Sequence, residues 1–127
     1  MFDHLSLGVS DLSRSLAFYD AILAPLSFTR CFALPHIAAY GPGQRPMFWL
    51  SHKAEFPILI QPAGGFHLAF QAESRQAVDE FYKAAIAHGA TDDGPPGLRP
   101  HYHPNYYAAF VLDPDGYRLE AVCHQPA

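Results

Sequence analysis

The chain has 127 residues, of which 50% are hydrophobic and 16% are charged, and its formal net charge is −4. These values are typical of one globular domain and exclude a disordered chain. No run of basic residues is present, which argues against nucleic-acid binding. No stretch reaches the roughly 18 consecutive apolar residues that span a membrane.

The N-terminal stretch, MFDHLSLGVSDL, lacks the basic start and the long apolar segment of a secretory signal. Cys31 and Cys123 lie far apart and show neither zinc-ribbon nor redox-motif spacing. We therefore expect two buried free thiols in a reducing compartment. Together these features predict a cytoplasmic protein.

The first predicted strand covers residues 4–9, HLSLGV, in which apolar residues alternate with polar or small ones. The two leucines and the valine point to one face and His4 points to the other, as in a strand with one face on a core. Residues 10–11, Ser and Asp, provide a cap for a helix whose apolar residues recur at helical spacing as far as residue 23.

Three further strands are predicted in this half of the chain. Their sequences are LSFTRCF, HIAAY and PMFWLSH, and the turn-rich loop GPGQRP separates the last two. The stretch EFPILIQPAGG that follows has no strand or helix period, and we interpret it as a linker.

The second half opens with another alternating stretch, HLAFQA at residues 67–72, with His67 opposite the apolar face. Ser74 caps a second helix, and Gly89 closes it. Three β-like segments follow this helix: a poorly defined one near ATDDG, then NYYAAFVL and YRLEAVCH. The loop DPDG between the last two is a strong turn signal.

The two halves read as copies of one unit. Residues 3–23 and 66–86 align without a gap at a constant offset of 63, which matches His4 with His67 and the Phe-Tyr pair at 18–19 with that at 81–82. Each copy has the order β-α-β-β-β. We place module one at about residues 1–62 and module two at about residues 65–127, within one domain.

The stretches DHLSLGVSDLSRSLAFYDAIL, FHLAFQA and AAFVLDPDGYRLEAV resemble the vicinal oxygen chelate superfamily, which includes glyoxalase I, extradiol dioxygenases, and fosfomycin and bleomycin resistance proteins. The resemblance implies an α+β fold in which two βαβββ modules form a curved, partly open barrel. It also implies three metal ligands, His4, His67 and Glu120. The fourth ligand of glyoxalase I would fall at Trp49 or Leu50, and neither side chain can bind a metal.

The strand patterns support the same trio. His4 and His67 take equivalent positions opposite the apolar faces, and Glu120 points away from the apolar set of its own strand. Two imidazoles and a carboxylate suit a divalent metal, Zn²⁺, Mn²⁺, Fe²⁺, Co²⁺ or Ni²⁺, and leave positions open for water and substrate. The alternative is that the two histidines are hydrogen-bonded core residues.

Residues 97–110, GLRPHYHPNYYAAF, contain more histidine, tyrosine and arginine side chains than a plain connecting loop needs. Arg99 is suited to holding a carboxylate or phosphate, and His101 or His103 to moving a proton. Tyr102 and Tyr106, with Trp49, are suited to lining a groove for a small organic ligand. Alternatively, Tyr106 and the tyrosine that follows it begin a strand, one ring facing the helices and the other the barrel.

Two functions follow. The first is a metal-dependent enzyme, a lyase or a dioxygenase for example, in which an oxygenated substrate binds the metal and Glu120 takes part in catalysis. The second is a metal-free protein that sequesters a small molecule, as the bleomycin resistance proteins do. A scaffold with a vestigial site is the third and least informative alternative. Under either main hypothesis we expect a homodimer with PMFWL or FPILI at its interface.

Overall fold

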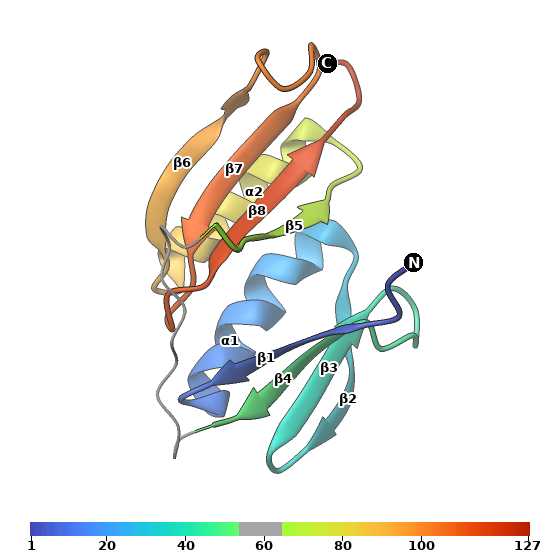
Figure 1. Ribbon diagram of the computed structural model, residues 1–127, viewed down its shortest axis with the longest axis vertical. Helices are drawn as coiled ribbons and strands as arrows, with labels where there is room; N and C mark the ends of the chain where they lie inside the picture. Colours follow the sequence, from blue (N-terminus) through green and yellow to red (C-terminus); the bar gives the residue numbers. More distant parts are fainter. Residues whose placement is uncertain (54–64) are drawn as a thin grey trace.

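The computed structural model describes residues 1–53 and 65–127, and it contains two four-stranded sheets, each with a helix against it (Figure 1). Most of the predicted linker, including the FPILI stretch, lies outside the described residues. The α+β fold and the βαβββ order predicted for each half are confirmed.

Module one follows the predicted order closely. The strands are β1 (Leu5–Val9), β2 (Thr29–Leu34), β3 (Ile37–Gly41) and β4 (Phe48–His52). Helix α1 (Leu12–Leu23) leads directly into the short 3-10 helix η1 (Ala24–Leu26). Asp11, and not Ser10, is the N-cap of α1, since its carboxylate accepts a hydrogen bond from the Arg14 backbone N–H at 3.1 Å.

Module two repeats this order. The strands are β5 (Leu68–Gln71), β6 (Thr91–Leu98), β7 (Tyr107–Leu112) and β8 (Arg118–Cys123). Ser74 caps helix α2 (Arg75–Ala87) as predicted, by accepting a hydrogen bond from the Ala77 N–H. Gly89 follows the helix with φ of 99°, a conformation that favours glycine, and it ends the helix as expected.

The strand orders show the internal repeat directly. Sheet one has the order β1-β4-β3-β2 and sheet two has the order β5-β8-β7-β6, so each strand has its counterpart in the other module. In both sheets the first strand pairs in parallel with the last, Leu5 opposite Phe48 and Leu68 opposite Leu119. The sheets do not close into one barrel, in agreement with the partly open form that was expected.

Strand β6 is the element that sequence patterns described least well. It runs over TDDGPPGL, with two prolines and two glycines, and its register with β7 shifts on both sides of Gly94. Proline cannot donate to a ladder, so it is tolerated at a sheet edge. Strand β6 is such an edge, and its irregular pairing is consistent with that place.

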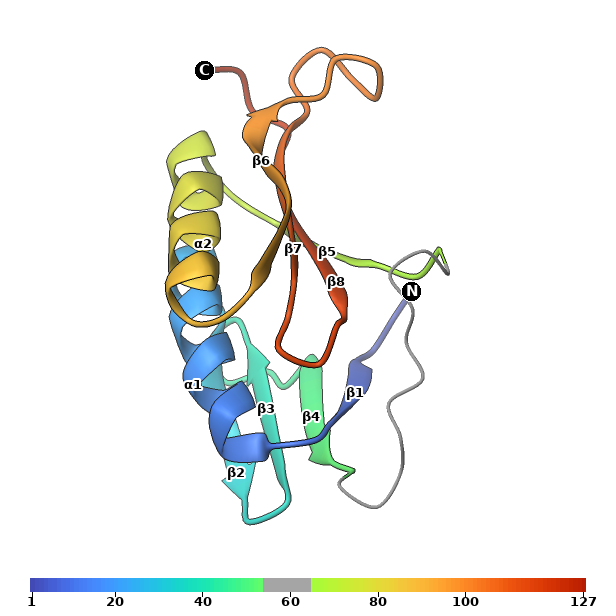
Figure 2. The same cartoon turned by 90° about the vertical axis from the view of Figure 1, so that its left-hand side faces the viewer.

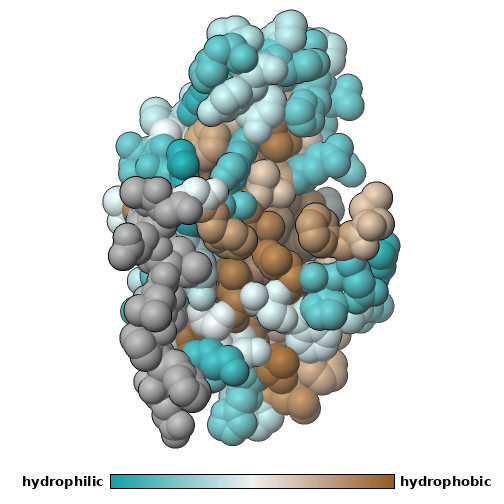
Figure 3. Space-filling view, in the orientation of Figure 1, coloured by the Kyte–Doolittle hydropathy of each residue, from teal (hydrophilic) through white to brown (hydrophobic). Residues whose placement is uncertain are grey.

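The two helices lie on one side of the molecule and the sheets on the other (Figure 2). Helix α1 packs against α2, and both cover the apolar faces of the sheets. The largest fully buried side chains come from both modules and include Tyr19, Phe18 and Phe81. On the opposite side, hydrophobic side chains extend from the middle of the molecule toward its lower end, and hydrophilic ones gather at the top (Figure 3).

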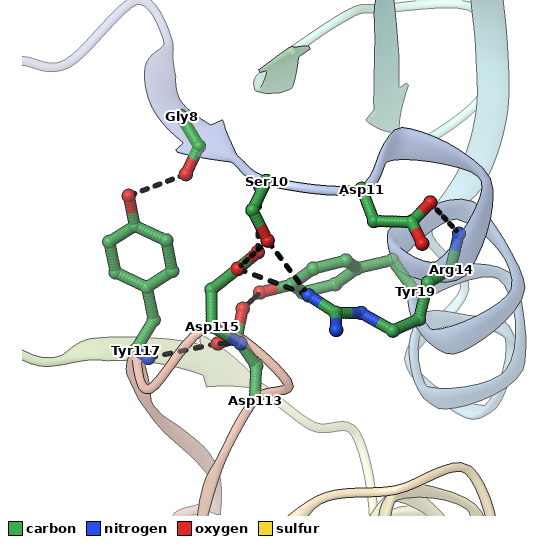
Figure 4. Close-up of polar contacts among 8 residues, drawn as sticks. All are labelled: Gly8, Ser10, Asp11, Arg14, Tyr19, Asp113, Asp115 and Tyr117. Atoms are coloured by element: carbon green, nitrogen blue, oxygen red, sulfur yellow. Dashed lines mark hydrogen bonds and ion pairs between the residues drawn. The ribbon is translucent and has the colours of Figure 1, made fainter. Parts of the chain in front are cut away.

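A cluster of polar contacts joins the β7–β8 turn of module two to the start of module one (Figure 4). The buried Tyr19 hydroxyl donates to the carboxylate of Asp113, which is only 4% exposed. Asp115 accepts hydrogen bonds from the Ser10 hydroxyl and from the Arg14 guanidinium. The Tyr117 hydroxyl donates to a backbone carbonyl of β1 at 2.6 Å. The predicted DPDG turn therefore also holds the two modules together.

Two sequence expectations concern burial and membranes. Cys123 is buried and Cys31 is partly buried, and both thiols are free. Within the described residues, the helices are too short and too polar to cross a membrane.

Candidate functional site

The candidate site begins with a buried carboxylate on β8. Alternation along this strand sends Leu119 and Ala121 into the core beneath α2 and sends Arg118 and Glu120 to the opposite face of the sheet. Glu120 is nevertheless only 1% exposed. A buried acidic side chain requires partners, because an unpaired charge in the protein interior is costly.

Both carboxylate oxygens of Glu120 have a partner. Oε1 lies 3.1 Å from Nε2 of His67, which immediately precedes β5, and Oε2 accepts a hydrogen bond from the Tyr106 hydroxyl. Burial, together with the neighbouring carboxylate, raises the pKa of Tyr106, so its phenol stays protonated and donates at neutral pH. The structure therefore brings together three of the residues singled out in the sequence.

A cavity of about 360 Å³ opens next to this group. It combines ionisable side chains with aromatic rings, and its lining residues are His67, Tyr102, Tyr106, Phe110, Arg118 and Glu120. Tyr102 lies at the solvent side, since it is 61% exposed. Mostly apolar walls with a few fixed polar groups are typical of small-molecule sites.

Two lining residues were missed in the sequence, Arg118 and Phe110. Phe110 on β7 pairs in register with Glu120, which places the two side chains beside each other on one face of the sheet. Arg118 sits two residues before Glu120 on the same face, with its guanidinium 5.3 Å from the centre of the Phe110 ring. The alternation along β8 could have placed Arg118 on the same face as Glu120, whereas placing Phe110 there requires the register between β7 and β8.

Arg99 does not line this cavity. Its guanidinium turns back onto its own strand and donates to the carbonyls of Gly97 at 2.8 Å and Pro95 at 2.9 Å. A Cβ at Gly94 or Gly97 would approach the Arg99 guanidinium to 3.2 Å, so both glycines make room for it. In this structure Arg99 fastens the irregular edge strand.

His101 and His103 also lie outside the cavity lining, although each of them lies against a neighbouring aromatic ring. His101 stacks on Tyr102 with 4.3 Å between ring centres. His103 accepts a hydrogen bond from the Asn105 backbone and lies against His124. A proton-transfer role for either histidine stays a prediction.

The side chains of the two tyrosines at the start of β7 point to opposite faces of the sheet, as in the alternative in which these residues begin a strand. The Tyr107 hydroxyl donates to Asp79 on α2 at 2.6 Å, so this residue faces the helix. Tyr106 faces the cavity and Glu120.

His4 and Trp49 lie on module one. The His4 Nδ1 atom is 2.7 Å from a carboxylate oxygen of the adjacent Asp3, and the His4 ring lies 6.5 Å from that of Trp49 in an edge-to-face arrangement. Trp49 pairs with Ser6 as Glu120 pairs with Ala69. Trp49, and not Leu50, is therefore the repeat counterpart of Glu120.

The expected metal trio does not form within one chain. His67 and Glu120 converge, but His4 is absent from the cavity that they line. Over residues 1–53 and 65–127, no three His, Cys, Asp or Glu side chains gather closely enough to hold a metal ion. The donor set of a single chain thus fits two positions of a His/His/carboxylate centre and lacks the third.

Comparisons with known proteins agree with this fold. The family model described as Glyoxalase/Bleomycin resistance protein/Dioxygenase superfamily matches residues 1–121. A comparison with curated proteins found no match.

Several solved structures are similar over nearly the whole chain. A glyoxalase/bleomycin resistance protein from Albidiferax ferrireducens T118 is 33% identical, with a TM-score of 0.85 over 97% of this chain and 98% of that one. A glyoxalase/bleomycin resistance protein/dioxygenase family enzyme from Burkholderia phytofirmans PsJN is 21% identical, with a TM-score of 0.73 over 97% and 98% of the two chains. The fosfomycin resistance protein FosX from Listeria monocytogenes shares the fold at 20% identity, with a TM-score of 0.70 over 97% and 92%. The chain belongs to the glyoxalase/bleomycin resistance protein/dioxygenase superfamily.

Proposed function

We propose that this protein is a metal-dependent enzyme that acts on a small oxygenated molecule bound in the cavity beside Glu120. In this proposal His67 and Glu120 hold a divalent metal, and His4 of a second copy of the chain supplies the third ligand. The observation that carries the proposal is the buried Glu120 carboxylate, which faces a cavity and lies 3.1 Å from a histidine nitrogen.

The surface around His4 supports a site shared between two copies. His4 is half exposed and its ring lies near that of Trp49, which in turn contacts the exposed apolar side chain of Phe32 on β2, 41% exposed. The Phe32 ring packs 5.4 Å from that of Trp49. Exposed apolar side chains of this size are typical of an interface.

The burial of two side chains corrects the expectation that the whole PMFWL segment lies at a dimer interface. Within PMFWL, the side chains of Phe48 and Leu50 are buried in the core, so Pro46, Met47 and Trp49 remain for a partner or a ligand. In a twofold dimer, the sheet-one face of each copy would meet the sheet-two face of the other, which gives two identical sites.

A divalent metal at such a site would polarise a substrate carbonyl or lower the pKa of bound water. The chain's own residues would prepare the site. Tyr106 fixes one oxygen of Glu120 through its hydroxyl and leaves the other oxygen toward His67. The rings of Tyr102 and Phe110 would orient the substrate and exclude water.

Metal analysis of two complementary variants tests the proposal. H4A and H67A should each lose the metal that the wild type carries, because each removes one ligand. Mixing them under conditions of subunit exchange should restore about a quarter of an equivalent per chain, since half of the dimers are mixed and each mixed dimer contains one intact site. H52A, at the far end of β4, is the matched control and should bind metal as the wild type does.

Recovery on mixing would establish that the site is built from two chains. Metal binding by the wild type without recovery on mixing would place all ligands in one chain and refute the shared site. A wild type that stays free of metal after incubation with each of the candidate divalent ions would refute metal dependence.

The second candidate function is metal-free binding of a small molecule. Its support is that, in the described part of one chain, three metal donors do not converge, while three aromatic side chains line the cavity. Ligand-induced thermal stabilisation without any bound metal would favour this function over the first.

A further inference from the structure

Arg118 is the one cationic side chain among the lining residues of the cavity, and its orientation is fixed. Its Nε atom donates to Asp93 on β6 at 2.7 Å, and its guanidinium plane lies 5.3 Å from the centre of the Phe110 ring. An arginine held on one edge and supported on an aromatic face loses little conformational freedom when it binds a ligand.

The remaining edge of this guanidinium is available to a ligand. The guanidinium has five N–H donors, and within the described part of the chain its hydrogen bond is the one to Asp93. The two terminal nitrogens form a fork that matches the two oxygens of a carboxylate. Since the Arg118 side chain is 36% exposed, a ligand can reach it.

The charges of the site favour a single negative charge on the ligand. Arg118 is already paired with Asp93, and the Glu120 carboxylate faces the same cavity. A second negative group at the Arg118 end of the cavity would therefore meet Asp93, whereas a single carboxylate there would meet one well-oriented cation. The Cα atoms of Arg118 and Glu120 are about 7 Å apart, because the two residues are two positions apart on one strand.

We propose that the substrate is a monocarboxylate with an aromatic or other flat apolar body, whose carboxylate binds Arg118 and whose second oxygen group lies at His67 and Glu120. The inference rests on the proposed function, because it uses the same cavity. It names the class of molecule that this cavity selects.

Two probes that differ in charge alone test this inference. 4-Hydroxybenzoate has a carboxylate and a hydroxyl at opposite ends of a ring, and 4-hydroxybenzamide is its neutral counterpart. Titration of ¹⁵N-labelled protein, followed by NMR, reports shifts at cavity residues and at the Arg118 Nε–H. We expect the acid to bind roughly tenfold more tightly than the amide, and R118Q to remove that difference.

Three further variants keep the test sharp. R118K retains the charge but loses the planar fork, and we expect it to bind the acid roughly threefold more weakly than the wild type, which provides a result if R118Q does not fold. K83Q removes an equal charge on an exposed position of α2 and should leave binding of the acid unchanged. R99Q removes the rival arginine, whose guanidinium lies 5.4 Å from the centre of the Phe110 ring, and we expect it to weaken binding of the acid less than R118Q does.

The outcomes separate this inference from the proposed function. Equal binding of acid and amide at cavity residues, or a loss with R99Q in place of R118Q, would overturn the carboxylate inference and leave the cavity as the site. Binding of neither probe would also overturn it. The proposed function falls separately, if the wild type binds none of the candidate divalent ions, whichever probe binds in the cavity.

Discussion

Replacing Tyr106 by phenylalanine tests whether the site depends on its contact with Glu120. The change removes one hydroxyl and keeps the ring, so the loss reports on the hydrogen bond to a carboxylate that is 1% exposed. A hydrogen bond to a charged group contributes about 1.5–3 kcal/mol, and Tyr106 is itself only partly buried, which favours the lower end. We expect Y106F to lower the free energy of unfolding by about 1.5–2 kcal/mol at neutral pH.

The assay is urea unfolding followed by circular dichroism, with Y102F as the matched control. Tyr102 lines the same cavity, but its hydroxyl makes no hydrogen bond within the described residues and the residue is 61% exposed. Its variant should therefore stay within about 0.5 kcal/mol of the wild type. Equal unfolding free energies for Y106F and Y102F would refute the reasoning, because Glu120 would then be satisfied without Tyr106.

Three other predictions follow from the contacts between the modules, the helix cap and the exposed apolar face. Burial raises the pKa of Asp113, so the native state binds a proton more readily than the unfolded chain. The stability of the wild type relative to D113N should therefore increase as the pH falls from about 7 to about 4.5. A difference in unfolding free energy, measured in urea, that stays constant over this range would contradict the prediction. S74A should lose about 1 kcal/mol, measured by thermal unfolding, because the cap of α2 is removed, and S13A on the exposed first turn of α1 is its control. F32E should convert the proposed dimer to a 14.0 kDa monomer in light scattering, whereas an unchanged mass would place the interface elsewhere.

The elements of this fold were predictable where local patterns are strong. The alternation of HLSLGV and HLAFQA and the capping residues before each helix describe local geometry, which a short sequence window contains. The edge strand β6 was expected near ATDDG but its limits were not predicted, because its prolines and glycines have no strand period and are tolerated only through the strand's place at the sheet edge.

Some residues of the cavity were predictable from the sequence, but their assembly was not. The contact of His67 with Glu120 follows from two strand patterns and the repeat. The separation of His4 from them depends on how the two modules pack, which the contacts of Tyr19 and Asp113 help to fix. Likewise, the position of Phe110 beside Glu120 depends on the register of β7 with β8, and no local pattern contains that information.

The repeat explains why the chain has donors on both modules. Equivalent positions hold His4 and Trp49 in module one, but His67 and Glu120 in module two. Tryptophan has no metal-binding atom, so the proposed centre would take one protein donor from module one and two from module two, and would keep coordination sites for substrate and water. Module one then contributes one imidazole and an apolar ring, while module two contributes the charge, the hydrogen bonds and the cavity. This division is consistent with a site in which one module supplies most of the recognition and the equivalent surface of the other completes it.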